Sequence, residues 1–460
     1  MYNMFLKNKY VPNMLYIVFL IILLVWHFRM NTFGDDLYFK LYYDSLFLPD
    51  GSNFIYFRFM EWSWRFIIEF VITILCRWPI LWVIGDSVLF CLLSYLIPRI
   101  VINDFNKLNL DNRFLYIIIS IVLTVLFIFC NFSAIKSAGY IATTLNYTWP
   151  FILAILHVYI FKEYFYQKKN ISTIKKYVLG FISVISLIFA INMEIVLISL
   201  LTAYLLFFLY KSIHGEKNNI LSNFIDFIKT NKILLLYLAI IIVMLIIFIK
   251  CPGNKSRFLQ ESARVDFYSN IKLHNKLDIS FTAIYCMLLT TFDLIILLFF
   301  SLLSYYSSKF SNNKLIKILL FIPPVFLGIF YILNLSTGIN QFLFSFILSA
   351  FSPYGLFSHE LNLRTIFIVL SYLINILFVI ISLVLIYKNK AKLAFILFSL
   401  ILISFISQIV IGFAPSCLIW TYPISDYPGR WWIIFNGIHL FSIVILLREI
   451  INDRNKQIND

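Results

Sequence analysis

The chain has 460 residues, of which 62% are hydrophobic and only 13% are charged, and its formal net charge is +15. Soluble domains are nearer half apolar and a quarter charged, so this composition excludes a soluble globular domain. The apolar runs are also too long and too continuous for the alternating strands of a membrane β-barrel. We therefore predict an all-α fold, a polytopic transmembrane helical bundle.

Charged or Pro/Asn-rich segments divide the chain into about twelve predicted spans, which we treat as one transmembrane domain over residues 1–460. The spans are predicted at 11–28, 79–101, 114–131, 149–162, 177–191, 194–211, 232–250, 280–306, 315–334, 365–387, 393–413 and 431–448.

Lysine and arginine predict the sidedness of these spans. The net charge of +15 falls on one alternate set of loops, which are short and rich in lysine. By the positive-inside rule these loops and both termini are cytoplasmic. The excess positive charge then reflects topology and contact with anionic membrane lipid, and no nucleic-acid partner is expected.

The longer loops are predicted to lie outside the membrane. The cytoplasmic loops contain no glycine-rich phosphate-binding motif, so we expect any chemistry to face outward and to use no cytosolic nucleotide. The outer loops are predicted at 29–78, 132–148, 251–279, 335–364 and 414–430.

The first outer loop begins with the adjacent acids Asp35 and Asp36, directly after the first span. Carboxylates at the mouth of a membrane helix are costly and point to function. Farther along, polar side chains recur every three or four residues and predict one amphipathic helix near 54–77, lying along the membrane surface. Glu61 and Arg65 would form an i,i+4 pair on it. Arg65 either supports this helix or faces an active cavity.

The next outer segments add polar groups near the predicted outer face. Asn146 could hydrogen-bond a sugar, while Trp149 fits either a substrate contact or the aromatic belt of the membrane interface. Glu194 lies between two spans, where it is either solvated or paired with a cation, for which Arg257 and Arg430 are candidates.

The sequence Pro252-Gly-Asn-Lys-Ser-Arg257 follows the seventh span. Pro-Gly predicts a turn, and Lys255 and Arg257 then place positive charge where it suits a phosphate at the lipid interface. Arg430 is a second candidate phosphate ligand. Asp293 inside the eighth span is the strongest sequence argument for a transporter.

Together these motifs resemble a bacterial family of polytopic proteins of unknown function that is related to the GT-C membrane glycosyltransferases. The quoted pieces are Gly34-Asp-Asp-Leu-Tyr-Phe39, Glu61-Trp-Ser-Trp-Arg-Phe-Ile-Ile-Glu69, Ala138-Gly-Tyr-Ile-Ala-Thr-Thr-Leu-Asn-Tyr-Thr-Trp-Pro150 and Pro252-Gly-Asn-Lys-Ser-Arg257. Tyr140 stands where tryptophan is common in the family, and the region before Arg430 matches poorly.

The resemblance implies a GT-C-like bundle in the bacterial cytoplasmic membrane, acting on a polyprenyl-phosphate sugar donor and a cell-surface glycan acceptor. It implies that Asp35 or Asp36 serves as base or as a ligand of a divalent metal such as Mg²⁺ or Mn²⁺. A polysaccharide polymerase or ligase, and a flippase or transporter of lipid-linked oligosaccharide, stay open as alternatives.

Overall fold

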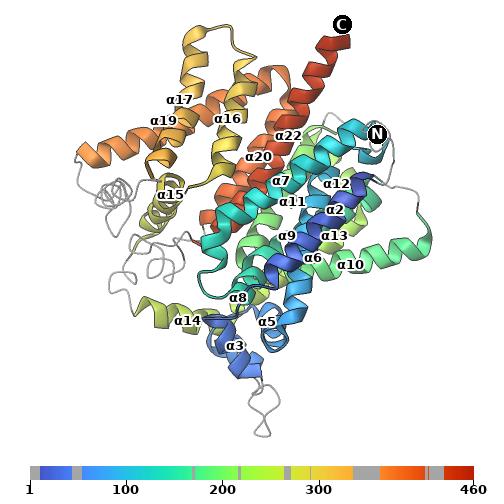
Figure 1. Cartoon of the computed structure of the whole chain (residues 1–460), viewed down its shortest axis with the longest axis vertical. Coiled ribbons are helices and arrows are strands. Elements are labelled where there is room, and N and C mark those ends of the chain that lie inside the picture. The colour runs from blue at the N-terminus through green and yellow to red at the C-terminus, as the bar shows by residue number, and fades with distance from the viewer. Residues whose placement is uncertain are drawn as a thin grey trace. The chain divides into compact units, whose positions relative to one another are not determined.

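A computed structural model describes residues 11–43, 54–167, 171–215, 219–263, 271–290, 292–334, 363–409, 413 and 429–459. Within these residues every regular element is a helix, which confirms the predicted all-α fold class (Figure 1). The chain divides into two compact units, Met1–Val125 with Ile135–Arg257, and Leu126–Ala134 with Phe258–Asp460. Each unit is described by itself.

The helices of the first unit are, in chain order, α2 (Val11–His27), α3 (Asp35–Tyr43), α4 (Phe54–Glu61), α5 (Phe66–Arg77), α6 (Pro79–Val101), η2 (Phe105–Lys107), most of α7 (Leu110–Ile135), α8 (Tyr140–Thr143), η3 (Thr144–Thr148), α9 (Trp149–Ile160), η4 (Phe161–Tyr166), α10 (Thr173–Ile191), α11 (Glu194–Ile213), α12 (Ile220–Thr230), α13 (Lys232–Lys250) and the start of α14 (Pro252–Ser262).

The helices of the second unit include the rest of α7 and of α14. They continue with α15 (Leu273–Thr290), α16 (Leu294–Ser308), α17 (Lys314–Asn334), α19 (Leu363–Asn389), α20 (Ala391–Ile409) and α22 (Trp432–Asn459).

Among the described residues, 10 helices are long and apolar enough to cross a membrane, and the bent pair α15 and α16 would make an eleventh. The apolar helix α2 is shorter, at 17 residues. These elements overlap each of the twelve predicted spans. The continuous apolar stretches of the sequence therefore locate the helices, and the polytopic bundle is confirmed.

The predicted eighth span, 280–306, is wrong as one continuous helix, because α15 and α16 lie at 91° to each other. Asp293 stands at this bend and caps α16: its Oδ1 accepts the backbone N–H groups of Ile295 and Ile296 at 3.0 and 3.2 Å. Its Oδ2 accepts the indole N–H of Trp432 at 2.6 Å. These bonds offset the cost of burying the carboxylate, so Asp293 has a structural reason to be where it is.

The single surface helix predicted near 54–77 is also wrong, since the structure has two helices, α4 and α5. The backbone N–H groups of Trp62 and Ser63 both bond the Arg58 carbonyl, at 2.9 and 2.7 Å, and the α-helical ladder stops there. Arg58 then reaches Glu69 on α5 with two hydrogen bonds of 2.7 and 2.8 Å. Two of the polar side chains that recur at helical spacing, Arg58 and Glu69, therefore hold the two helices together.

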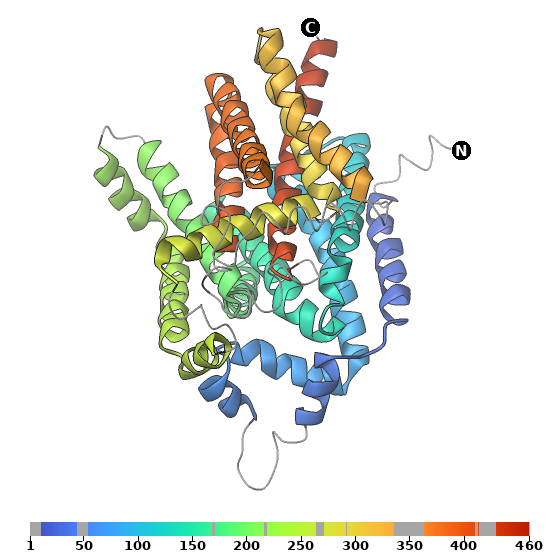
Figure 2. The ribbon, with the colours of Figure 1, turned by 90° about the vertical axis from the view of Figure 1, so that its left-hand side faces the viewer.

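The long element from α8 to η4 is one apolar stretch that includes two π-helical segments, η3 and η4. The indole N–H of Trp82 on α6 donates to the Thr144 hydroxyl at 2.9 Å and fixes η3 against α6. π-Helical turns within a helix are frequent at functional sites. Figure 2 shows the same ribbon turned by 90°.

Candidate functional site

The first unit brings the acidic pair against the start of α8. The Oδ1 atom of Asp36 accepts the backbone N–H of Ala142 at 2.8 Å. The Asp35 N–H donates to the Ala138 carbonyl at 2.5 Å. Asp36 therefore caps the beginning of the helical stretch 140–166, where a carboxylate meets unpaired N–H groups and the positive end of the helix dipole.

Two glycines permit this close approach. Gly34 has φ +55° and Gly139 has φ +139°, a region that L side chains rarely adopt. A Cβ atom at Gly139 would lie 2.5 Å from Asp36 Oδ1, and one at Gly34 would lie 2.5 Å from the Ala138 carbonyl oxygen. The Gly-Asp-Asp and Ala-Gly sequences, about a hundred residues apart, are thus two halves of one contact.

The two acids have different surroundings. Asp36 is fully buried, whereas Asp35 is exposed in the first turn of α3. Burial raises the pKa of Asp36 to about 6, against the lowering effect of backbone N–H groups such as that of Ala142. Its Oδ2 is buried without a hydrogen-bond partner among the described residues. The pair therefore consists of one buried cap and one accessible carboxylate.

A second charged pair joins the α4–α5 junction to the start of α11. The Nε atom of Arg65 donates to Glu194 Oε2 at 2.9 Å, and Nη2 donates to Oε1. The two side chains are only 13% and 18% exposed. Burial alone would lower the pKa of Arg65, but Glu194 more than offsets this and raises it, so the guanidinium stays charged. Arg65 is thus the hydrogen-bonded partner of Glu194. Of the two cations expected from the sequence, Arg257 adds a weaker electrostatic attraction to Glu194.

Asn146 connects the two charged clusters. It lies in η3, and its Oδ1 accepts Arg65 Nη1 at 3.2 Å while its Nδ2 donates to the Ala142 carbonyl at 2.8 Å. Ala142 is also the residue whose N–H bonds Asp36. The acidic pair and the Arg65–Glu194 pair therefore both contact one short segment, 138–149, the first at Ala138 and Ala142 and the second at Asn146.

The junction between α4 and α5 is held by asparagines from distant parts of the chain. Trp64 is 1% exposed, and its indole N–H donates to Glu194 Oε2 at 3.3 Å. Asn192 donates to the Trp64 carbonyl at 3.3 Å and accepts the Ile68 N–H at 3.1 Å. The Asn254 side chain accepts the Trp64 N–H at 3.4 Å. Backbone groups freed by the break are thus satisfied by side chains.

The Pro-Gly-Asn motif after α13 packs directly on this junction. A Cβ at Gly253 would lie 2.5 Å from the Phe59 carbonyl oxygen and 2.7 Å from the Trp62 backbone nitrogen. The Arg257 guanidinium lies 5.2 Å from the centre of the Trp62 ring, within cation–π range. Lys255 is exposed. The predicted phosphate-binding motif therefore lies beside the Glu61-Trp-Ser-Trp-Arg sequence.

Trp149 has a partner that the sequence analysis missed. Its indole N–H donates to Asp86 Oδ1 at 2.7 Å, and the other oxygen of Asp86 lies 2.9 Å from His27 Nε2. Asp86 and His27 are both 1% exposed. His27 and Asp86 each lie inside a predicted span, and an ionisable residue in a span needs a partner, so the sequence contained a signal for this network. It ties α2, α6 and α9 together, and a role of Trp149 in substrate binding stays a prediction.

No family model, curated protein or solved structure matches this chain. The GT-C resemblance therefore rests on the motifs and enters below as a proposal.

Among the described residues no group of three or more His, Cys, Asp or Glu side chains is placed to hold a metal ion, so a metal at Asp35 and Asp36 also stays a prediction. Arg430 lies in the second unit, half-buried just before α22.

The four motifs that carry the resemblance thus contact one another. The motif 34–39 and the motif 61–69 both bond the segment 138–149, and the motif 252–257 packs on the α4–α5 junction within 61–69. Figure 1 shows α3, α5 and α8 together at one end of the first unit. Chemically, this region offers an accessible carboxylate, a neutralised Arg–Glu pair and a cationic segment stacked on tryptophan.

Proposed function

We propose that the chain is a membrane glycosyltransferase that moves a sugar from a polyprenyl-phosphate donor to a glycan acceptor. The observation that supports this most is the convergence of the Gly34–Asp36, Glu61–Arg65, 138–149 and 252–257 sequences at one end of the first unit. Sequence positions up to about two hundred residues apart are brought together there, as an active site requires.

Asp35 is the residue we assign as the base. In the proposed step the acceptor hydroxyl attacks the anomeric carbon, and the bond from that carbon to the phosphate oxygen breaks. The proton of the hydroxyl passes to the Asp35 carboxylate, and polyprenyl phosphate leaves with the bonding electrons. Asp35 is exposed and can meet a substrate, which a general base must do.

Asp36 is assigned a positioning role. Its fully buried side chain holds the Ala138–Ala142 backbone and so fixes the first turn of α3, on which Asp35 stands. A base that must be held within a fraction of an ångström benefits from such a rigid neighbour. The sequence left open which of the two acids acts, and this proposal gives each a distinct role.

Arg257 and Lys255 are the groups we assign to the donor phosphate. Arg257 has a planar guanidinium that suits bidentate contact with phosphate, and Trp62 supports it from one side. Charge on the leaving phosphate develops during the reaction, and fixed cations near it stabilise the transition state. Arg65 is not assigned to the phosphate, since Glu194 and Asn146 already occupy its donors.

A flippase or transporter of lipid-linked oligosaccharide is the alternative with an observation behind it. In the second unit α15 and α16 form a bent pair, and interrupted helices are common in transporters. The acid at that bend, Asp293, is bonded by Trp432 and by the start of α16, which favours a structural role for it.

The test uses the purified full chain in lipid nanodiscs with a panel of polyprenyl-phosphate-linked hexoses, following release of polyprenyl phosphate. We expect Asp35→Asn to lower the rate about a hundredfold or more without changing the melting temperature. Asp111→Asn is the matched control, because Asp111 is also an exposed acid in the first turn of a helix. Full activity of Asp35→Asn, or transport of the donor across vesicles without bond cleavage, would overturn the proposal.

A further inference from the structure

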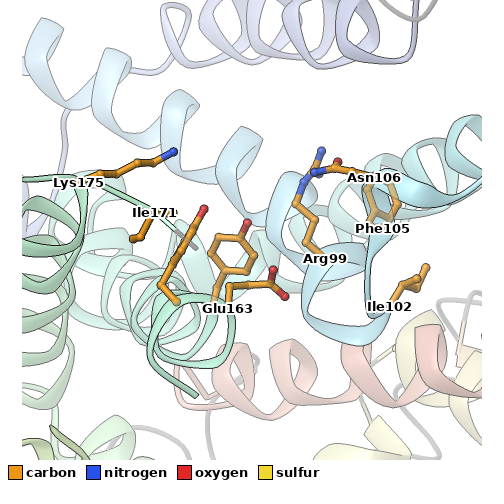
Figure 3. Close-up of a pocket in the computed structure, with 9 residues that line it drawn as sticks. Arg99, Ile102, Phe105, Asn106, Glu163, Ile171 and Lys175 are labelled. Carbon is orange, nitrogen blue, oxygen red and sulfur yellow. The ribbon is translucent and has the colours of Figure 1, made fainter. Parts of the chain in front are cut away.

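The first unit contains a pocket of about 300 Å³ that the proposed sugar transfer does not use. It is formed by the ends of α6 and α9, the η2 turn, the η4 segment and the start of α10. Its lining residues are Arg99, Ile102, Phe105, Asn106, Tyr159, Glu163, Tyr164, Ile171 and Lys175 (Figure 3). The lining is rich in groups that donate hydrogen bonds.

The pocket lies at the other end of the spanning helices from the acidic pair. α6 begins directly after α5 and ends at Val101, a length of about 34 Å. The stretch from α8 to η4 likewise starts at the capping contact of Asp36 and ends in the pocket. By the charge rule this end faces the cytoplasm, where anionic phospholipid headgroups attract basic residues.

Arg99 is the residue that gives the pocket its chemistry. It is 6% exposed, and its guanidinium lies 3.4 Å from the centre of the Tyr95 ring and 4.6 Å from that of Phe105. Only its Nη1 has hydrogen-bond partners among the described residues, the Tyr95 carbonyl at 2.8 Å and the Tyr16 hydroxyl at 3.4 Å. No carboxylate in the described part of the chain lies within ion-pair distance of Arg99.

A buried arginine without a carboxylate calls for an anion. Figure 3 shows Lys175 on the opposite side of the pocket from Arg99, with its ammonium end directed toward the interior. Glu163 also lines the pocket, and the Lys162 ammonium lies 3.7 Å from its carboxylate and partly neutralises it. Among the described lining residues, Arg99 and Lys175 stand against the single carboxylate of Glu163, which Lys162 beside the pocket partly neutralises, so the pocket is positive.

We propose that this pocket binds the phosphate of a membrane phospholipid headgroup. Arg99 presents its unused N–H donors to the phosphate, and Lys175 adds a second charge from α10. The lipid source is favoured by α10 itself, a candidate membrane span that exposes an apolar stripe beside Lys175. Its members Ile174, Phe181 and Ile185 are 78%, 66% and 51% exposed and suit contact with acyl chains.

The test is native mass spectrometry of the purified full chain, titrated with dioctanoyl phosphatidylglycerol. We expect Lys175→Gln to weaken binding about fivefold. Lys176→Gln should leave it unchanged, since Lys176 is also exposed and adjacent in sequence but is not among the residues that line the pocket. Arg99→Lys keeps the charge and removes the planar fork, so it should also weaken binding at least fivefold.

Two further probes separate the sources of the phosphate. Dioctanoylglycerol, which lacks phosphate, should not compete, and inorganic phosphate should compete far less well than the phospholipid. Equal loss in Lys175→Gln and Lys176→Gln, or equal binding of dioctanoylglycerol, would overturn the pocket. Inorganic phosphate that binds as tightly as the phospholipid would overturn the lipid assignment.

Discussion

Replacing one member of the Arg65–Glu194 pair gives the sharpest test of the proposed site architecture. In Glu194→Met the guanidinium of Arg65 loses two of its three side-chain bonds and keeps only the one to Asn146. The indole N–H of Trp64 loses its acceptor as well. Methionine fills a similar volume, so the change removes charge rather than packing.

The expected loss is large because the pair is mostly buried, at 13% and 18% exposure. Removing one partner of such a pair leaves an uncompensated charge and costs about 3–5 kcal/mol. For a unit of this size that corresponds to a fall in melting temperature of roughly 6–20 °C. The double variant Arg65→Met with Glu194→Met removes both charges and should be more stable than either single variant.

The assay is thermal unfolding in detergent, followed by a thiol-reactive fluorogenic dye that reports exposure of buried cysteines such as Cys76 and Cys251. Lys107→Ala is the control, because its ion pair with Asp104 is at the surface, with side chains 80% and 52% exposed, and is worth under about 0.5 kcal/mol. If Glu194→Met shifts melting no more than this control, or if the two Met substitutions are simply additive, the pair does not hold the junction.

Two other predictions concern the capping contact and the glycine at the junction. The pKa of Asp36 in the folded protein, about 6, lies above its ordinary 3.8. The contribution of Asp36 to the free energy of unfolding is therefore fully present below about pH 4 and falls by up to about 3 kcal/mol as the pH rises through 6. Asp36→Asn should flatten this dependence in melting curves from pH 4 to 8, and an unchanged slope would contradict it. Gly253→Ala should cost about 1–3 kcal/mol, because its Cβ would lie 2.5 Å from the Phe59 carbonyl oxygen, whereas Gly180→Ala meets only an ordinary contact at 3.5 Å. Equal melting temperatures for the two alanine variants would refute the close approach.

The sequence predicted the spanning helices well because their signal is local. The predicted span 79–101 coincides with α6, where Pro79 occupies the first turn and needs no N–H partner. The predicted start at Glu194 likewise coincides with the start of α11. Continuous apolar runs bounded by charge define such helices without knowledge of the fold.

The sequence failed where distant residues decide the backbone. Polar side chains at helical spacing continue through Trp62 and Trp64, so periodicity alone predicted one helix over 54–77. The break is stabilised by Asn192 and Asn254, which are over a hundred residues away and bond the Trp64 backbone. The helical periodicity of a segment carries no information about partners so far away in the sequence. Tertiary contacts can therefore override the helix that the periodicity predicts.

The candidate site was predicted in its parts and not in its assignments. Adjacent acids suggested one joint centre, yet the contact between Asp36 and Ala142, which joins residues 106 apart, gives Asp36 surroundings different from those of the exposed Asp35. For Glu194 the sequence left open a solvated carboxylate or one paired with a cation, and the structure shows the pair. The chain has 37 lysines and arginines, and nothing local selects Arg65 among them.

Arg65 and Arg99 show why the surroundings of a buried charge, and not its burial, indicate its role. Both side chains lie in the first unit, at 13% and 6% exposure, and both are arginines at the edge of apolar helices. Arg65 meets a carboxylate with two hydrogen bonds, so its charge is already neutralised and its loss should be felt as lost stability. Arg99 lies against aromatic rings that support its charge without neutralising it. Desolvating an arginine is costly, and the ring contacts offset only part of that cost. In our proposal a bound anion offsets the rest. Substitution at Arg65 should therefore change the melting temperature at any lipid concentration, whereas substitution at Arg99 should change it most when phospholipid is present.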